Sequence, residues 1–406
     1  MKIPELTAPA GNFEKLRVAC AFGADAVYLA GKEYGLRAHA GNFERGELQE
    51  AVAYAHRLNA RVYVAVNIFA GNADLERLPE YFEYLEEIGA DAVIIADLGV
   101  FSVARRALKR VKIHISTQAG VTNYESARVW REMGAERVVL AREVSLAEMA
   151  GIAAKLPGFP LECFAHGAMC VSYSGRCLIS AFMSGRSANR GDCAQPCRFG
   201  YDLTERQSGA VFGLEEDERG SYIMNSKDLC AVSFLPELIE AGASALKLEG
   251  RMKTPHYAAS VTSAYRRALG DLARGGEAAY RANLPQYLAE LRKSPNRAYT
   301  SGLYFGPEER FVGEPAPRPY EFIGITRAYN EETHTALVEQ RGKFSRGEEI
   351  EFLTPGGAFL QTAEDLRGAE GEPIECAPHA QQLVRLKTIQ PAPELSILRK
   401  KPREPK

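Results

Sequence analysis

The chain has 406 residues, a formal net charge of −2, and a composition that is 46% hydrophobic and 25% charged. Because single hydrophobic cores split beyond roughly 250 to 300 residues, this length predicts two or three domains, and the near-zero net charge excludes a general attraction to nucleic acid or membranes. No apolar run reaches the ~20 residues that span a bilayer, and the N-terminal residues lack the pattern of a signal peptide, so we expect a cytoplasmic protein without a membrane partner.

Four stretches that begin with Gly-Ala recur in the first part of the chain: GADAVYLAG at 23, GADAVIIAD at 89, GAERVVLAR at 134 and GASALKLEG at 242. A glycine in the left-handed conformation often ends a helix, and the apolar run that follows is typical of a strand in a parallel sheet covered on both faces. Further apolar runs at 61–67, 112–118 and 161–167, together with KIPELTA at the start, bring the expected strands to eight.

Segments with helical periodicity separate these strands. Residues 12–22 have apolar side chains at helical spacing with Asn12 as the N-cap, and the segments 74–89 and 123–134 each end at a glycine. Eight strands that alternate with helices predict an α/β fold, a (β/α)8 barrel of the TIM type over residues 1–270. A doubly wound open sheet is the alternative, but no G-x-G-x-x-G follows the first strand.

A cysteine-rich insertion at 168–235 separates strand seven from strand eight. It follows the carboxyl end of a strand, the side on which such barrels carry their sites. Its thiols have the spacing C-x6-C-x15-C-x3-C, from Cys170 through Cys177 and Cys193 to Cys197, and Cys230 follows later. In a reducing compartment this pattern favours a metal site, either zinc or an iron–sulfur cluster, over unpaired structural thiols or a redox disulfide.

The C-terminal third has a different pattern. We expect a helical segment and linker at 271–318, which includes the Pro-containing GEPAPRPYEF. Short alternating strands separated by turns then predict a small β-barrel domain at 319–392. The end, 393–406, contains RKKPREPK and is predicted to be a basic disordered tail.

Polar residues at the carboxyl ends of the predicted strands are candidate functional residues, because these ends line the barrel mouth. His166 ends strand seven and is a candidate catalytic residue. The alternative is a structural histidine whose ring nitrogens form hydrogen bonds within the protein at the strand end. Lys247, Glu249 and Arg251 share one face of strand eight, where Lys247 is a candidate for substrate binding and the other two for catalysis. A structural Arg–Glu pair is the alternative there. The remaining candidates for substrate binding form a polar ring: Asn67, Asp97, Gln118, Arg142 and Glu143.

Three of these motifs carry a resemblance to a known family. ECFAHGAMCVSYSGRCLIS followed by NRGDCAQPCR is similar to the signature of the U32 family, labelled collagenase-like peptidases. LTAPAGNFEKLRVACAFGADAVYLAG and KLEGRMKTPHYAASV are similar to the opening and strand-eight motifs of that family. The resemblance extends to about residue 310, and the predicted C-terminal β domain fits the subgroup of tRNA uridine-34 5-hydroxylation proteins.

This resemblance implies a [4Fe–4S] cluster held by Cys170, Cys177, Cys193 and Cys197, with Cys230 as the alternative fourth ligand. It also implies prephenate-dependent hydroxylation of the wobble uridine of tRNA, with prephenate as co-substrate and an electron donor that the sequence does not identify. Relatives imply hydroxylation of ribosomal RNA or of a quinone precursor as alternatives. A peptidase is a further alternative, although the sequence has neither H-E-x-x-H nor G-x-S-x-G, and a non-catalytic RNA-binding protein is the last.

Overall fold

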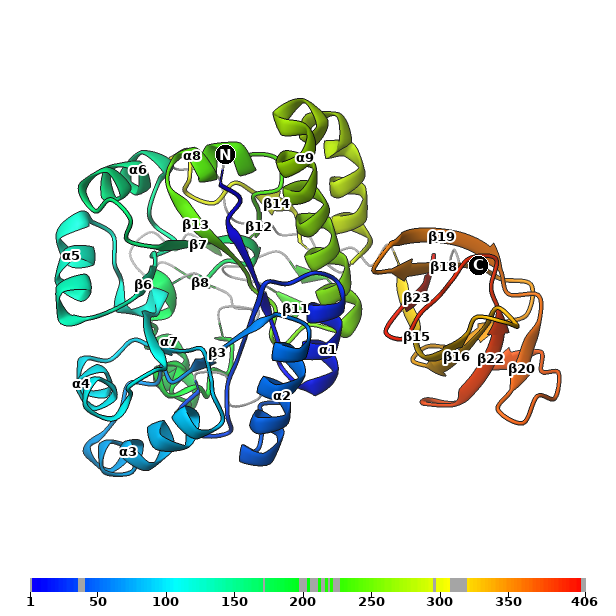
Figure 1. Cartoon of the computed structure of the whole chain (residues 1–406), viewed down its shortest axis with the longest axis horizontal. Coiled ribbons are helices and arrows are strands. Elements are labelled where there is room, and N and C mark those ends of the chain that lie inside the picture. The colour runs from blue at the N-terminus through cyan, green and yellow to red at the C-terminus, as the bar shows by residue number, and fades with distance from the viewer. Residues whose placement is uncertain are drawn as a thin grey trace.

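The computed structural model describes residues 2–35, 41–170, 172–196, 227–294, 297–306 and 320–402. It also describes four short strands inside the cysteine-rich insertion: β8 (Leu203–Thr204), β9 (Val211–Phe212), β10 (Glu216–Asp217) and β11 (Gly220–Ser221). Two bodies are visible in Figure 1, a barrel surrounded by helices and an all-β domain beside helices α1 and α9.

Eight parallel strands form a closed barrel, as the sequence predicts. They are β1 (Glu5–Pro9), β2 (Ala26–Leu29), β3 (Arg61–Ala65), β4 (Ala92–Ile95), β5 (Lys112–Ile115), β6 (Arg137–Val139), β7 (Leu161–Ala168) and β13 (Ala243–Leu248). Each strand pairs with the next in this order, and β13 pairs with both β7 and β1, which closes the barrel. The predicted TIM-type fold is confirmed, with the insertion between the seventh and eighth strands.

Helices on the outside connect the strands: α1 (Phe13–Ala21), α2 (Arg45–Arg57), α3 (Asn72–Glu87), α4 (Leu98–Ala107), α5 (Tyr124–Met133), α6 (Leu146–Lys155) and α8 (Leu235–Glu240). The Asn12 side chain caps α1 by accepting from Lys15 N at 2.9 Å. Each predicted helix-ending glycine has a positive φ: Gly23, Gly89, Gly134 and Gly242. Among the described residues, no helix is both long and apolar enough to cross a membrane.

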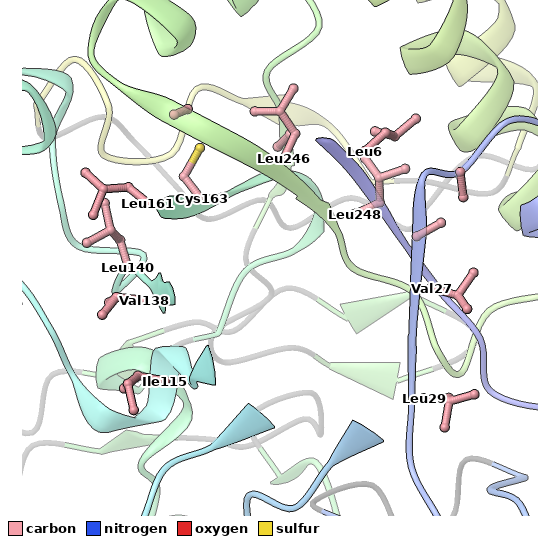
Figure 2. Close-up of a cluster of buried hydrophobic side chains, with 14 of the residues drawn as sticks. Leu6, Val27, Leu29, Ile115, Val138, Leu140, Leu161, Cys163, Leu246 and Leu248 are labelled. Atoms are coloured by element: carbon pink, nitrogen blue, oxygen red, sulfur yellow. The ribbon is translucent and has the colours of Figure 1, made fainter. Parts of the chain in front are cut away.

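The outward face of the barrel strands is apolar and packs against the helices. Figure 2 shows this layer with the labelled side chains Leu6, Val27, Leu29, Ile115, Val138, Leu140, Leu161, Cys163, Leu246 and Leu248. All of them are buried. Burial of this apolar area between sheet and helices supplies most of the driving force for the barrel.

The inward face combines a small apolar cluster with charged side chains that pair across the barrel. The Glu162 carboxylate accepts from Lys247 Nζ at 2.7 Å and from Arg137 Nη1 at 2.9 Å. Arg137 also donates to Glu5 of β1 at 2.7 Å. Because β1 and β6 are not neighbours in the sheet, this contact crosses the interior. Burial alone would raise the pKa of Glu162, but the Lys247 and Arg137 cations outweigh it and lower the pKa to about 2.

Helix α9 (Pro255–Lys293) folds back on itself at Gly276, which has φ 64° and ψ −163°. Asn283 Nδ2 donates to Asp271 and Arg267 donates to Gln286, each at 3.0 Å. Residues this far apart in sequence would be separated by roughly 18 Å or more on a straight helix. Two antiparallel arms therefore follow the barrel, as Figure 1 shows for α9.

The second arm of α9 belongs to the barrel body. Tyr280, Tyr287 and Leu291 lie in the main hydrophobic core. The strand that follows, β14 (Tyr299–Thr300), joins the barrel sheet through β12 (Asp228–Cys230), which itself pairs with the end of β7. The segment expected to be helical from residue 271 is the second arm of α9, and because its apolar face is buried on the barrel, the barrel body extends beyond residue 270.

The C-terminal domain is all-β, as expected. Its seven-stranded antiparallel sheet contains β15 (Glu321–Asn330), β16 (Thr335–Gln340), β18 (Glu349–Thr354), β19 (Gly357–Thr362), β20 (Leu366–Gly368), β22 (Leu383–Lys387) and β23 (Ile397–Lys400). A separate pair is formed by β17 (Phe344–Ser345) and β21 (Cys376–Ala377). The prediction of disorder from residue 393 was wrong for β23, which lies between β18 and β15 within the sheet.

The two bodies meet at a buried ionic contact. Arg399 of β23 is fully buried and binds both carboxylate oxygens of Glu290 on α9, at 2.6 and 2.7 Å. Its second amino group also donates to Glu351 of β18 at 2.6 Å. An apolar cluster that joins α1 and α9 to the C-terminal sheet includes Val18, Phe22, Ala259, Ile325 and Ile397. The C-terminal domain is thus fixed to the barrel through the residue that the sequence assigned to a tail.

Candidate functional site

The cysteine-rich segment lies over the carboxyl ends of the barrel strands. Arg176 Nε donates to Gln118 O in the turn η1 (Thr117–Ala119) after β5 at 2.6 Å, and its guanidinium lies over the Phe69 ring after β3. The Phe69 N–H donates to Asn189 O at 3.1 Å. Arg190 binds Asp74 at the start of α3 at 3.0 Å. The segment is therefore anchored on the loops that follow two different strands.

Glu143, which is predicted to bind substrate, also holds this segment. Its carboxylate accepts from Ser174 N at 2.8 Å and from the Ser174 hydroxyl. Ser174 lies in the turn η2 (Tyr173–Gly175), is buried, and has a φ of 45°, which non-glycine residues seldom adopt. The two hydrogen bonds to Glu143 hold this backbone conformation in place.

The thiols of this segment are available for ligation. Cys170 and Cys193 are exposed, Cys177 is half-buried, and none of the described cysteines forms a disulfide. The Gln195 N–H donates to Cys193 Sγ at 3.4 Å, the type of contact that stabilises a thiolate bound to iron. Within the described ranges no three Cys, His, Asp or Glu side chains are gathered as a metal site, and Cys197 lies outside those ranges. The donor chemistry fits a thiolate-bound cluster, and the ligand set stays a prediction.

Cys230, the alternative fourth ligand, lies in a different environment. It is opposite His166 in the β7–β12 pair and is part of the main hydrophobic core. Burial raises the pKa of its thiol to about 11. A thiol this strongly desolvated favours the protonated form, whereas a cluster ligand must be a thiolate. Because a bound metal itself removes the thiol proton, this pKa does not decide between Cys197 and Cys230 as the fourth ligand.

His166 is buried among three tyrosines beside the barrel mouth. Its ring packs against Tyr257, Tyr265 and Tyr299 with centroid distances of 6.0, 5.5 and 5.5 Å. The Tyr265 hydroxyl donates to Ala165 O at 2.6 Å and lies 3.4 Å from His166 Nδ1. Since that hydroxyl proton is already used, Nδ1 carries the proton in this pair, and Nε2 has no hydrogen-bond partner among the described residues. His166 thus presents an unprotonated ring nitrogen.

The end of strand eight reaches the same region. Glu249 N donates to His166 O at 2.8 Å, and the Tyr28 hydroxyl donates to the Glu249 carboxylate at 2.7 Å. The backbone here is close-packed, because a side chain on Gly167 would meet Glu249 O at 2.4 Å. Arg251 is only 3% exposed. The structure therefore brings His166 and Glu249 together at the seam between β7 and β13, with Arg251 two residues further along.

Lys247 lies deeper in the barrel interior than Glu249 and Arg251, which follow it on the same face of strand eight. Its ammonium lies 2.7 Å from Glu162 and 4.2 Å from the centre of the Tyr28 ring. It is 5% exposed. This placement makes Lys247 part of the internal ionic network, and its contact with substrate stays a prediction.

The other residues of the polar ring make hydrogen bonds or ring contacts within the protein. Asn67 Nδ2 donates to the Gln118 side chain at 2.9 Å, which links the ends of β3 and β5. The Arg142 guanidinium stacks on Phe164, 4.0 Å from the ring centre. Asp97 caps helix α4 by accepting from Val100 N at 3.0 Å. Asn67, Gln118 and Arg142 are half-buried, and their role as substrate contacts stays a prediction.

Sequence reasoning missed several residues around His166. Asp228 of β12 is buried beside it and raises its pKa, against the larger effect of burial. The three tyrosines come from α9 and β14, far along the chain from strand seven. Only the tertiary fold brings them together, so the spacing of residues contains no signal for this pocket.

The buried histidines predict how stability depends on pH. Burial lowers the pKa of His166 to about 4 and that of His256 to about 3. An unfolded histidine titrates near pH 6.5, so below this value the unfolded chain binds more protons and the free energy of unfolding falls. We expect a loss of about 1.4 kcal/mol per pH unit for each such histidine between pH 6.5 and 4. Urea unfolding across this range should show the slope, which His166→Phe should reduce and exposed His379→Gln should leave unchanged. A slope that is the same in His166→Phe and wild type would contradict this assignment.

Comparison with known proteins places the chain in a family. Residues 11–312 match Peptidase family U32 and residues 318–399 match the Peptidase family U32 C-terminal domain. The tRNA hydroxylation protein P1 of Bacillus subtilis (strain 168) is 39% identical, over 95% of this chain and 92% of that protein. The 23S rRNA 5-hydroxycytidine C2501 synthase of Escherichia coli (strain K12) is 34% identical, over 74% of this chain and 48% of that protein. The Collagenase of Porphyromonas gingivalis (strain ATCC BAA-308 / W83) is 30% identical, over 93% of both. The chain belongs to peptidase family U32.

Proposed function

We propose that this protein is an RNA hydroxylase that acts on tRNA and forms 5-hydroxyuridine at position 34, with prephenate and a [4Fe–4S] cluster. The observation that carries the proposal is the anchoring of a segment with free thiols over the barrel mouth, next to a neutral buried histidine. The similarity to tRNA hydroxylation protein P1 over nearly the whole chain supports tRNA as the substrate.

In this proposal Cys170, Cys177, Cys193 and Cys197 hold the cluster. When bound, the cluster supplies the electron transfer that an oxidation at carbon needs. Arg176, Arg190 and Glu143 position the segment that carries these thiols, through their contacts with the barrel loops and Ser174. They are positioning residues and do not themselves need to touch the substrate.

His166 is proposed to accept a proton from the substrate at Nε2. Its low pKa keeps the ring neutral at pH 7, and Tyr265 fixes the tautomer by accepting from Nδ1. Arg251 would bind a carboxylate of prephenate, because a guanidinium recognises a carboxylate through two parallel hydrogen bonds. Glu249, held by Tyr28, would orient the substrate between these two groups.

A peptidase is disfavoured by the same geometry. Cys230 is the thiol opposite His166 and would be the candidate nucleophile. A cysteine peptidase needs a thiolate beside a protonated imidazole. Here burial raises the pKa of the Cys230 thiol to about 11 and lowers the pKa of His166 to about 4, so both groups are neutral near pH 7. The similarity to a protein named Collagenase therefore lacks a matching catalytic pair at this position.

Mass spectrometry of nucleosides tests the proposal. We expect tRNA from cells that lack the protein to have no 5-hydroxyuridine derivatives, and the wild-type gene to restore them. Persistence of these nucleosides in the deletion strain, in the absence of a second enzyme of this kind, would refute the tRNA assignment. Loss of a hydroxylated nucleoside from ribosomal RNA in the same strain would instead assign the activity to that substrate, as in the rRNA relative.

A further inference from the structure

A groove with a volume of about 610 Å³ lies on the C-terminal domain. Its lining comes from the outward face of β15, β16, β22 and β20 and the turns next to them. Three cations face it, Arg367, Arg385 and Lys387, against one carboxylate, Asp365. Tyr329 adds an aromatic ring to the wall. The groove is therefore locally basic in a chain whose net charge is −2.

Two of the cations in this groove lie close enough to repel each other. Arg385 of β22 is directly opposite Arg367 of β20 in the antiparallel ladder, so the two side chains lie on the same face. Like charges directly opposite each other destabilise a sheet. Lys387, two positions further along β22, is exposed, and within the described residues its ammonium has no ion-pair or hydrogen-bond partner. Arg367 is paired with Asp365 at 2.8 Å, so an anionic ligand would compensate mainly for Arg385 and Lys387.

At least half of the basic residues between 247 and 297 already pair with carboxylates of the protein. The segment from 247 to 297 is rich in Lys and Arg. Five of its ten cations form ion pairs with the carboxylates of Glu162, Asp25, Asp271, Glu277 and Glu351. Cations that are paired with carboxylates of the protein cannot also neutralise an external polyanion at full strength. The groove is the better candidate for an electrostatic contact.

We infer that this groove binds the phosphate backbone of the RNA substrate, at nucleotides away from the one being modified. The inference rests on the proposed RNA substrate. Arg385 and Lys387 would each contact a phosphate, and the half-buried Tyr329 would offer a face to a sugar or base. Contacts of this kind position an RNA without reading its sequence. The C-terminal domain would thus hold the RNA while the barrel mouth receives the target base.

The test uses the full-length protein and fluorescently labelled tRNA, with affinity measured by anisotropy over a range of KCl concentrations. Arg385→Gln/Lys387→Gln removes both cations from the groove. Lys343→Gln/Arg346→Gln removes two exposed cations of the same domain that do not line it. We expect the groove variant to lose on the order of tenfold or more in affinity. The slope of log K against log salt should become shallower by about two, one for each lost phosphate contact.

Charge-preserving variants separate electrostatics from folding. Arg385→Lys/Lys387→Arg should keep both the affinity and the salt slope of the wild type. Equal affinity and slope for the groove variant, its control and the wild type would overturn the inference, as would equal losses in both neutralised variants. The proposed function is tested separately by the nucleosides of the deletion strain. The two results can differ. If the groove variant binds tRNA normally while hydroxylation in cells depends on the protein, the proposed function holds and only the proposed role of the groove is refuted.

Discussion

Replacing Cys193 with serine is expected to abolish 5-hydroxyuridine formation in complemented deletion cells, with a loss of more than about 100-fold. Even the loss of a residue that only hydrogen-bonds to a metal ligand costs roughly 10- to 100-fold. Serine preserves the size of the side chain and accepts the hydrogen bond from Gln195 N, but its oxygen is a hard ligand that iron–sulfur clusters do not favour. The purified variant should also lack the visible absorption of a cluster and contain less iron. These measurements are made on protein purified without oxygen.

Two cysteine variants serve as controls. Cys376→Ser changes a half-buried thiol in the β17–β21 pair of the C-terminal domain and should leave iron content and hydroxylation unchanged. Cys230→Ala should also retain the cluster, since Cys230 lies in the hydrophobic core opposite His166. Wild-type iron content in Cys193→Ser would exclude that residue as a ligand. Loss of the cluster in Cys230→Ala but not in Cys197→Ala would exchange the two assignments.

Arg399→Met is expected to lower the free energy of unfolding by about 3–5 kcal/mol, which is the usual cost of leaving a buried charge without its partner. The Arg399 side chain is fully buried and binds the carboxylates of Glu290 and Glu351 at 2.6 to 2.7 Å. Methionine fills a similar volume but leaves both carboxylates without their cation, apart from Lys293 at the edge of the pair. Urea unfolding followed by circular dichroism measures the change.

The matched control is Arg346→Met, which removes an exposed cation that lies 3.6 Å from Glu375. An exposed pair of this kind contributes between about 0 and 1 kcal/mol. Adding Glu290→Gln and Glu351→Gln to Arg399→Met should recover part of the loss, because the uncompensated charges are then gone. If Arg399→Met is no more destabilising than Arg346→Met, the contact between the two bodies does not depend on this ionic cluster.

The barrel could be predicted from the sequence because its signals are local. Each Gly-Ala repeat ends a helix with a left-handed glycine and begins a strand, and both events depend on residues that adjoin in the chain. The N-cap of α1 at Asn12 is predictable for the same reason. The cysteine-rich insertion can also be recognised by its composition. Because it follows the carboxyl end of strand seven, the sequence also predicts that it lies at the barrel mouth.

Long-range pairings gave no such signal. The sequence places Arg399 and its neighbour Lys400 in a polar tail, and only the fold brings Glu290 and Glu351 to Arg399. Lys247 sits on the same strand face as Glu249, yet Glu162 of the adjacent strand removes it from the mouth. In both cases a charged side chain is buried because it pairs with a carboxylate from a distant part of the sequence. Only the tertiary structure shows which carboxylate that is.

The short strand β12 has a consequence for how this barrel can change during evolution. Ala168 and Asp228 are directly opposite each other where β12 pairs with β7, so the excursion that carries the clustered cysteines leaves and re-enters the barrel wall at one point. The entropic cost of closing such a loop grows only slowly with its length. Insertions or deletions between these two residues therefore leave the register of the eight strands intact. A barrel built this way can acquire a new recognition surface while His166 and its tyrosines keep their positions.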